Sequence, residues 1–123
     1  MPCKAYPTDA CFDLFLPQDE TVMPSSSALL DLGFRMQMPE GWEGQIRGRS
    51  GLARKGLTVH FGTVDHLYRK NVGVIVFNCS SHPIVLKKGD RIAQIKFARV
   101  YDTELVQGEV QQTDRDGFGS TGR

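Results

Sequence analysis

Alternating apolar and polar residues predict β-strands along most of the chain. Apolar side chains occupy every second position over residues 30–38, which is the period of a half-buried strand. Residues 12–16 form a shorter run of the same kind. Residues 72–77 are apolar at both alternating sets of positions and rich in β-branched side chains, which predicts a strand buried between two layers. Further short strands are expected at residues 84–86, 92–100 and 105–110.

Turn-forming residues separate these predicted strands, at residues 24–27, 39–41, 81–83 and 88–90. The stretch that favours a short helix is residues 51–55, with Ser50 as its N-cap and Gly56 as its C-terminal stop. Many short strands with frequent turns favour an all-β domain, a jelly-roll-like sandwich or barrel, over an α/β fold.

The length, net charge and cysteine content of the chain indicate which kinds of partner to expect. A chain of 123 residues is long enough for one domain with its own core. A formal net charge of +1 gives no overall field for binding a nucleic-acid polymer or an anionic membrane, and no apolar run is long enough to span a bilayer. Three cysteines without metal-type spacing and without a preceding signal peptide predict an intracellular, cytoplasmic protein with free thiols, the nucleus being left open.

A phosphate site is predicted just before the short helix. The sequence Arg47-Gly48-Arg49-Ser50-Gly51 places two guanidinium groups, a hydroxyl and main-chain N–H groups at the positive end of that helix. The alternative is that Ser50 only caps the helix and the arginines are solvated surface.

Two further stretches carry polar residues in or beside predicted strands. Residues 62–68 include Asp65 and Tyr68 and lead into the strand at residues 72–77, so a hairpin here would offer main-chain groups to a base edge. A lone Asp in a turn is more often structural. Gln94 interrupts an apolar strand and needs hydrogen bonds if it is buried, whereas on an edge strand water would satisfy it.

The C-terminal residues 115–122 combine three glycines, two hydroxyls, an aromatic ring and an arginine. Main-chain N–H groups made accessible by glycine suit a polyphosphate, and Phe118 could lie on a base, so a nucleoside triphosphate would satisfy both. The alternative is a disordered glycine-serine tail, because disorder concentrates at termini.

Five stretches taken together resemble the five ordered motifs of the trimeric deoxyuridine triphosphatases. They are residues 10–14, 48–52, 62–69, 88–94 and 117–122, and they span nearly the whole chain. The resemblance implies a jelly-roll-like subunit (residues 1–110) of a homotrimer, with three active sites at subunit boundaries. It also implies an exchanged C-terminal arm (residues 111–123) that closes over a site, and hydrolysis of dUTP to dUMP and pyrophosphate with Mg²⁺.

The same resemblance assigns roles at the base, the sugar and the attacking water. Asp65 would orient and deprotonate the water that attacks the α-phosphorus, and Tyr68 would lie against the deoxyribose and leave no room for a 2′-hydroxyl. Asn71 would support the turn or a bound water. Uracil would be read by main-chain groups around Gly62, Thr63 and Gly73.

For the triphosphate, the resemblance implies a site built from several segments. The α- and β-phosphates would be held by Arg49, Ser50 and Gly51. Gln94 would contact the phosphates or magnesium-bound water, and Asp13 would hydrogen-bond that water shell. Phe118 would stack on uracil. The γ-phosphate end of the arm would be formed by Arg115, Gly119, Ser120 and Thr121.

The chain departs from the family pattern at several positions. Leu67 stands where a second acidic residue is common, Lys70 stands where glycine is usual, and Arg115 is closer to Phe118 than is usual. If the turn required positive φ at residue 70, a lysine there would cost about 1 kcal/mol, unless Asn71 took the strained conformation instead. Two other functions remain in view, a non-catalytic nucleotide-binding regulator and a deoxycytidine triphosphate deaminase, although the hairpin holds no glutamate of the kind that a deaminase needs.

Overall fold

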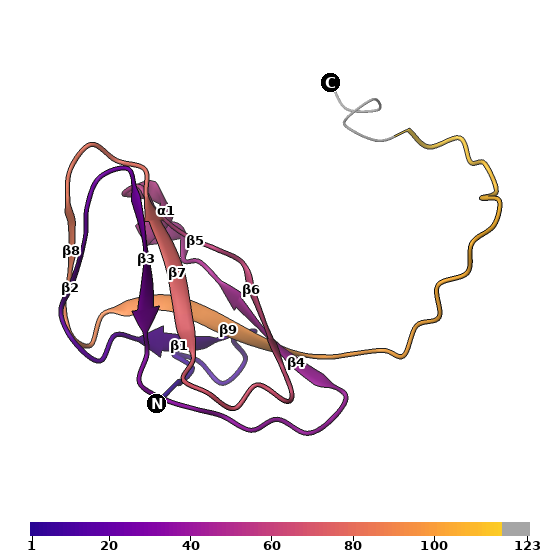
Figure 1. The fold of residues 1–123 in the computed structure, drawn as a ribbon, viewed down its shortest axis with the longest axis horizontal. Coiled ribbons are helices and arrows are strands. Elements are labelled where there is room, and N and C mark those ends of the chain that lie inside the picture. The colour runs from indigo at the N-terminus through magenta and orange to yellow at the C-terminus, as the bar shows by residue number, and fades with distance from the viewer. Residues whose placement is uncertain (117–123) are drawn as a thin grey trace.

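The computed structural model describes residues 1–116, which form nine strands and one short helix (Figure 1). In chain order the strands are β1 (Phe12–Phe15), β2 (Glu20–Val22), β3 (Ser26–Asp31), β4 (Trp42–Arg47), β5 (Leu57–Val59), β6 (Gly62–Asp65), β7 (Gly73–Asn78), β8 (Ile84–Leu86) and β9 (Arg91–Arg99). The helix α1 (Ser50–Arg54) lies between β4 and β5. The predicted all-β fold is confirmed. No helix in this part of the chain is long and apolar enough to cross a membrane.

The strands pair antiparallel into three sheets, with orders β1-β9-β4-β6, β3-β7-β5 and β2-β8. One buried apolar cluster takes side chains from all three sheets, including Leu14, Val22, Val76 and Ile95. Each of these alternates along its strand with more exposed neighbours, as expected for sheets packed over a common core. The result is the jelly-roll-like arrangement that the strand pattern predicts.

The predicted strand at residues 30–38 is only partly present. β3 ends at Asp31, and Gly33 takes a φ of +72°. Main-chain bonding continues past the break, because the Val72 carbonyl accepts from Leu32 N–H and Val72 N–H donates to the Phe34 carbonyl, both at 2.9 Å. Burial still alternates as far as Met38, although residues 35–38 belong to no assigned strand. A two-residue period therefore identifies the side chains that face the core, but it does not supply a partner strand.

β7 is buried on one face in the single chain, not on both as predicted. Val74 and Val76 point into the core, whereas Ile75 is 47% exposed. Ile75 lies opposite Leu29 of β3, which is 71% exposed, and Phe77 projects on the same side of β7 as Ile75. We call Leu29, Ile75 and Phe77 the outer apolar face. It is a continuous apolar surface that nothing in residues 1–116 covers.

The predicted strand at residues 105–110 is absent from the described fold. After β9 the chain leaves the sheets and runs outward as an extended segment (Figure 1). Its apolar side chains are solvent-exposed, Leu105 to 92%, and residues 101–116 are exposed throughout. The apolar pattern alone predicts a strand, but in the described part of the chain there is no sheet edge beside this segment with which it could pair.

The short helix begins one residue earlier than predicted. Arg49 is the N-cap, with extended dihedrals (φ −111°, ψ 138°), and Ser50 is the first helical residue, so the prediction of Ser50 as N-cap is wrong. The predicted stop is confirmed. Gly56 takes a φ of +98°, and its N–H donates to the Ala53 carbonyl (3.0 Å), as is typical of a glycine just past a helix.

Candidate active site

A pocket of about 180 Å³ opens along β6 and the start of β7. Five residues that the sequence analysis selected line it, and three apolar residues complete its wall. The selected residues are Gly62, Thr63, Asp65, Tyr68 and Gly73, and the apolar ones are Ile46, Val64 and Val72. The structure thus brings together the predicted base, sugar and water-activating residues. We call this the hairpin pocket.

The polar groups of the hairpin pocket come from an edge strand. β6 pairs with β4 on one side only, so within residues 1–116 one row of its main-chain groups has no strand partner. Along β6, Val64 is buried while Thr63 and Asp65 on either side of it are exposed. A flat ligand with donors and acceptors along one edge can therefore bind main-chain groups while the Asp65 carboxylate stays in water.

The turn after β6 is fixed by a chain of hydrogen bonds. Tyr68 N–H donates to the Asp65 carbonyl (3.0 Å), and the Tyr68 hydroxyl donates to the Asn71 carbonyl (2.7 Å). The Asn71 side-chain amide donates to both carboxylate oxygens of Asp31, each at 3.2 Å. Gly33 N–H also donates to Asp31 (2.8 Å), and this bond, followed by the bond from Asn71, lowers the pKa of Asp31 below its ordinary value of 3.8.

Asp31 was not selected from the sequence. The only local pattern is Asp31-Leu32-Gly33, which is typical of a turn closed by its own carboxylate. Its contact with a residue 40 positions later depends on the pairing of β3 with β7.

Lys70 does not strain the turn. Ser25 is the only non-glycine residue with positive φ in the described chain, so neither Lys70 nor Asn71 takes the left-handed conformation. The conditional cost of a lysine at this position therefore does not arise, and the turn forms without glycine.

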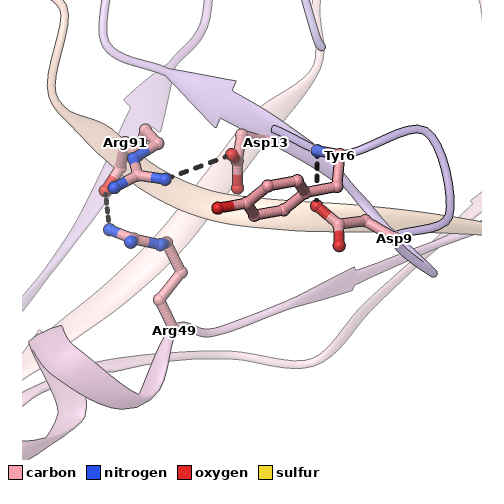
Figure 2. A network of polar contacts seen from close by, with 5 residues as sticks. All are labelled: Tyr6, Asp9, Asp13, Arg49 and Arg91. Carbon is pink, nitrogen blue, oxygen red and sulfur yellow. Dashed lines mark hydrogen bonds and ion pairs between the residues drawn. The ribbon is translucent and has the colours of Figure 1, made fainter. Parts of the chain in front are cut away.

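A second cluster lies where β1, β9 and the turn before α1 meet (Figure 2). The Arg91 guanidinium lies 3.4 Å from the Asp13 carboxylate, and the Arg49 guanidinium donates to the Arg91 carbonyl (3.1 Å). Beside them, Tyr6 N–H donates to the Asp9 carboxylate (3.0 Å). We call Asp13, Arg49, Arg91 and Gln94 the cationic cluster. Arg91 was not selected as a site residue, although it stands three positions before Gln94.

Gln94 is held against the predicted phosphate turn. Its side-chain amide donates to the Gly48 carbonyl (2.9 Å), and in the β1–β9 register Gln94 lies opposite Asp13. Ser50 and Gly51 come after Gly48 and Arg49 in the chain, and both are exposed. A Cβ built on Gly51 would meet no heavy atom within 4 Å. The predicted phosphate residues thus share one open, positively charged corner. Among the described residues, no group of three or more acidic, histidine or cysteine side chains is placed to hold a metal ion.

Asp65 of the hairpin pocket lies well away from Gln94 of the cationic cluster within one chain. On β4, Glu43 pairs with Asp65 while Arg47 pairs with Gln94, so the two groups are four residues apart along β4 and two strand spacings apart across the sheet. That places Asp65 roughly 15 Å from Gln94. We call the hairpin pocket and the cationic cluster the two half-sites.

Of the predicted arm residues the structure describes only Arg115, which contributes to neither half-site. Arg115 lies in the exposed extended segment, where its N–H donates to the Thr113 hydroxyl (3.3 Å). The other predicted arm residues, Phe118, Gly119, Ser120 and Thr121, lie outside the described residues.

Comparison with known proteins decides the family. The family model described as dUTPase matches residues 1–122. The chain belongs to the dUTPase family. A deoxyuridine 5′-triphosphate nucleotidohydrolase from Hydrogenobaculum sp. is 44% identical over 117 residues, covering 89% of this chain and 81% of the relative. The variola virus dUTPase is 39% identical over 124 residues, covering 98% and 84% of the two chains.

Solved dUTPase structures share the fold. The Staphylococcus bacteriophage 80alpha dUTPase with dUPNHPP superposes with a TM-score of 0.86 at 25% identity, covering 99% of this chain and 91% of that one. The dUTPase of phage phi11 of S. aureus, described with a structural Mg(II) ion, matches with a TM-score of 0.81 at 23% identity, covering 89% and 90%. The second likeness supports the fold alone.

Proposed function

We propose that this protein hydrolyses dUTP to dUMP and pyrophosphate. The observation that carries this function is the hairpin pocket, where an exposed carboxylate, a tyrosine and an edge strand meet in a chain of the dUTPase family. Relatives that are 39% and 44% identical over most of their length are named deoxyuridine 5′-triphosphate nucleotidohydrolases. The chain is a nucleotide hydrolase.

Asp65 is the group that orients and deprotonates the attacking water. Its position at the end of β6, exposed at the rim of the hairpin pocket, supports this role because the carboxylate can reach solvent and ligand together. The water then attacks the α-phosphorus in line with the departing pyrophosphate, and the proton passes to the Asp65 carboxylate.

The hairpin pocket selects the base and the sugar. Main-chain groups at Gly62, Thr63 and Gly73 bind the uracil edge, and Tyr68 lies against the deoxyribose. The modest volume supports exclusion of a 5-methyl group, and misplaced polar groups would leave cytosine unpaired.

The cationic cluster binds the triphosphate. Arg49, with Ser50 and Gly51, holds the α- and β-phosphates, and Gln94 contacts the phosphates or their associated water. Asp13 would hold Mg²⁺ through a water shell, since a single carboxylate suits an ion chelated mainly by the triphosphate. When bound, Mg²⁺ neutralises charge that develops on the leaving pyrophosphate. Asp13 also contacts Arg91, which keeps that carboxylate turned toward the cluster.

The complete site is assembled from several subunits of a homotrimer. Three features support this assembly: the roughly 15 Å between the half-sites, the uncovered outer apolar face, and the exposed apolar side chains of the segment after β9. In the trimer the hairpin pocket of one subunit faces the cationic cluster of another. The arm, residues 111–123, then closes over the site, with Phe118 on uracil and Arg115, Gly119, Ser120 and Thr121 at the γ-phosphate end.

Pyrophosphate and ammonia release test this function together. Purified protein with magnesium is offered dUTP, dTTP, dCTP and UTP in parallel. Pyrophosphate from dUTP alone is the expected result. Ammonia from dCTP would identify a deaminase, and dUTP binding without either product would identify a nucleotide-binding regulator. Asp65→Asn should lower kcat by about 10²- to 10⁴-fold and leave dUTP binding nearly unchanged.

A further inference from the structure

We infer that Asp31 is a positioning residue for sugar selection, holding the Tyr68 ring in place through Asn71. The inference rests on the proposed function, because it concerns the same pocket. Asp31 lies at the end of β3, outside the hairpin, and touches none of the hairpin pocket's wall residues through its carboxylate.

Tyr68 lines two hollows. One is the hairpin pocket, and the other is a hollow of about 210 Å³ lined by Leu29, Asp31, Tyr68, Asn71, Gly73 and Ile75. Tyr68 is also 42% exposed, so packing holds its ring only loosely. Its position then depends on its hydroxyl, which donates to the Asn71 carbonyl (2.7 Å).

Asn71 in turn is exposed and lies in a turn, so its own position needs an anchor. That anchor is Asp31, whose two oxygens both accept from the Asn71 side-chain amide at 3.2 Å. The carboxylate is itself held by Gly33 N–H at 2.8 Å, which closes a turn on a rigid strand end. The three residues Asp31, Asn71 and Tyr68 form what we call the clamp.

The clamp explains how the turn can be ordered with Lys70 in place of glycine. The chain crosses residues 68–72 without positive φ, and the Asp31 carboxylate fixes the turn from the neighbouring strand. If the clamp is broken, the Tyr68 ring can swing toward the second hollow. The wall that excludes a 2′-hydroxyl is then displaced, while Asp65 and the cationic cluster are untouched.

Two variants separate the clamp from the turn. Asp31→Ser keeps a hydroxyl that can accept from Gly33 N–H but is too short to reach Asn71. Asn71→Ala removes the other partner and leaves Asp31 in its turn. Asp19→Ser is the matched control, since Asp19 is also an exposed carboxylate that accepts a main-chain N–H, from Lys88 at 2.8 Å, outside the hairpin.

The experiment measures kcat/KM for dUTP and UTP with pyrophosphate release. Asp31→Ser should raise the UTP:dUTP ratio of kcat/KM about two- to tenfold, the factor that corresponds to one ordinary hydrogen bond, with kcat for dUTP nearly unchanged. Asn71→Ala should raise the same ratio by a similar factor. The double variant should show no more than either single change, because both break the same connection. Asp19→Ser should keep the wild-type ratio.

An unchanged ratio in both variants, or effects that multiply in the double variant, would overturn the inference. Failure of the proposed function is a separate result: the wild-type protein would release no pyrophosphate from dUTP. In that case amide hydrogen exchange still decides whether the clamp exists. Asp31→Ser should speed exchange at residues 68–72 relative to wild type and Asp19→Ser, and equal exchange would contradict the clamp.

Discussion

Two inactive variants with damage in different half-sites should restore each other's activity when their subunits are mixed. The first variant is Asp65→Asn, which disables the hairpin pocket. The second is the double variant Arg49→Ala and Ser50→Ala, which disables the cationic cluster. All three side chains lie outside the core, so both proteins should fold and assemble.

The size of the recovery follows from the separation of the half-sites. If each site takes its hairpin pocket from one subunit and its cationic cluster from a neighbour, half of the pockets and half of the clusters in an equal mixture are intact. Random exchange then makes about a quarter of the sites fully intact, so activity should reach about a quarter of wild type. If both halves came from the same chain, no site in the mixture would be intact.

Subunit exchange is checked by native mass spectrometry with one variant carrying a tag, and activity is read as pyrophosphate release from dUTP. A matched mixture of Asp65→Asn with Asp65→Ala should recover nothing, because both changes remove the carboxylate of the hairpin pocket. The same holds for Gln94→Ala mixed with the Arg49 and Ser50 double variant. Exchanged trimers that stay inactive in the first mixture would refute the shared site.

Three further predictions concern stability and the arm. Asn78 is buried and makes bonds to the Val22 and His82 carbonyls (2.9 and 2.8 Å) and to Ser80, so Asn78→Ala should lower the free energy of unfolding by about 2–4 kcal/mol in urea titrations; a loss below about 0.5 kcal/mol would contradict this. The lowered pKa of Asp31 adds stability that is fully present above pH 3.8 and is lost as pH falls through the lowered pKa. The stability difference between wild type and Asp31→Asn should therefore shrink below pH 3.8, and a constant difference would argue against the bonded carboxylate. Ending the chain after Arg115 should remove most of the activity, and full activity would show that the arm does not close the site.

Local chemistry made much of this molecule predictable. The alternation around Phe12 and Leu14 located β1, and the glycine at position 56 located the end of the helix, since both depend on near neighbours in the chain. The residues of the hairpin pocket were also accessible from sequence. All but Ile46 come from one continuous stretch, residues 62–73, whose first part, residues 62–69, resembles a family motif.

The features that the sequence did not predict depend on how segments far apart in the chain lie beside one another. The segment around Leu105 has the apolar pattern of a strand, but whether it forms one depends on a sheet edge lying beside it, and residues 1–116 place none there. The stretch around Ile75 has the composition of a strand buried on both faces, yet nothing in residues 1–116 covers the outer apolar face. Asp31 reaches Asn71 only because β3 and β7 pair in one particular register, and no local pattern carries that register.

The fate of the attacking oxygen tests the central claim most directly. The protein is incubated with dUTP and magnesium in oxygen-18 water. The products are separated, and mass spectrometry measures the oxygen-18 content of each. The account predicts dUMP and pyrophosphate, with the label in dUMP, because water positioned by Asp65 attacks the α-phosphorus. Label in pyrophosphate would place the attack on another phosphorus, and unconverted dUTP would contradict the hydrolase itself.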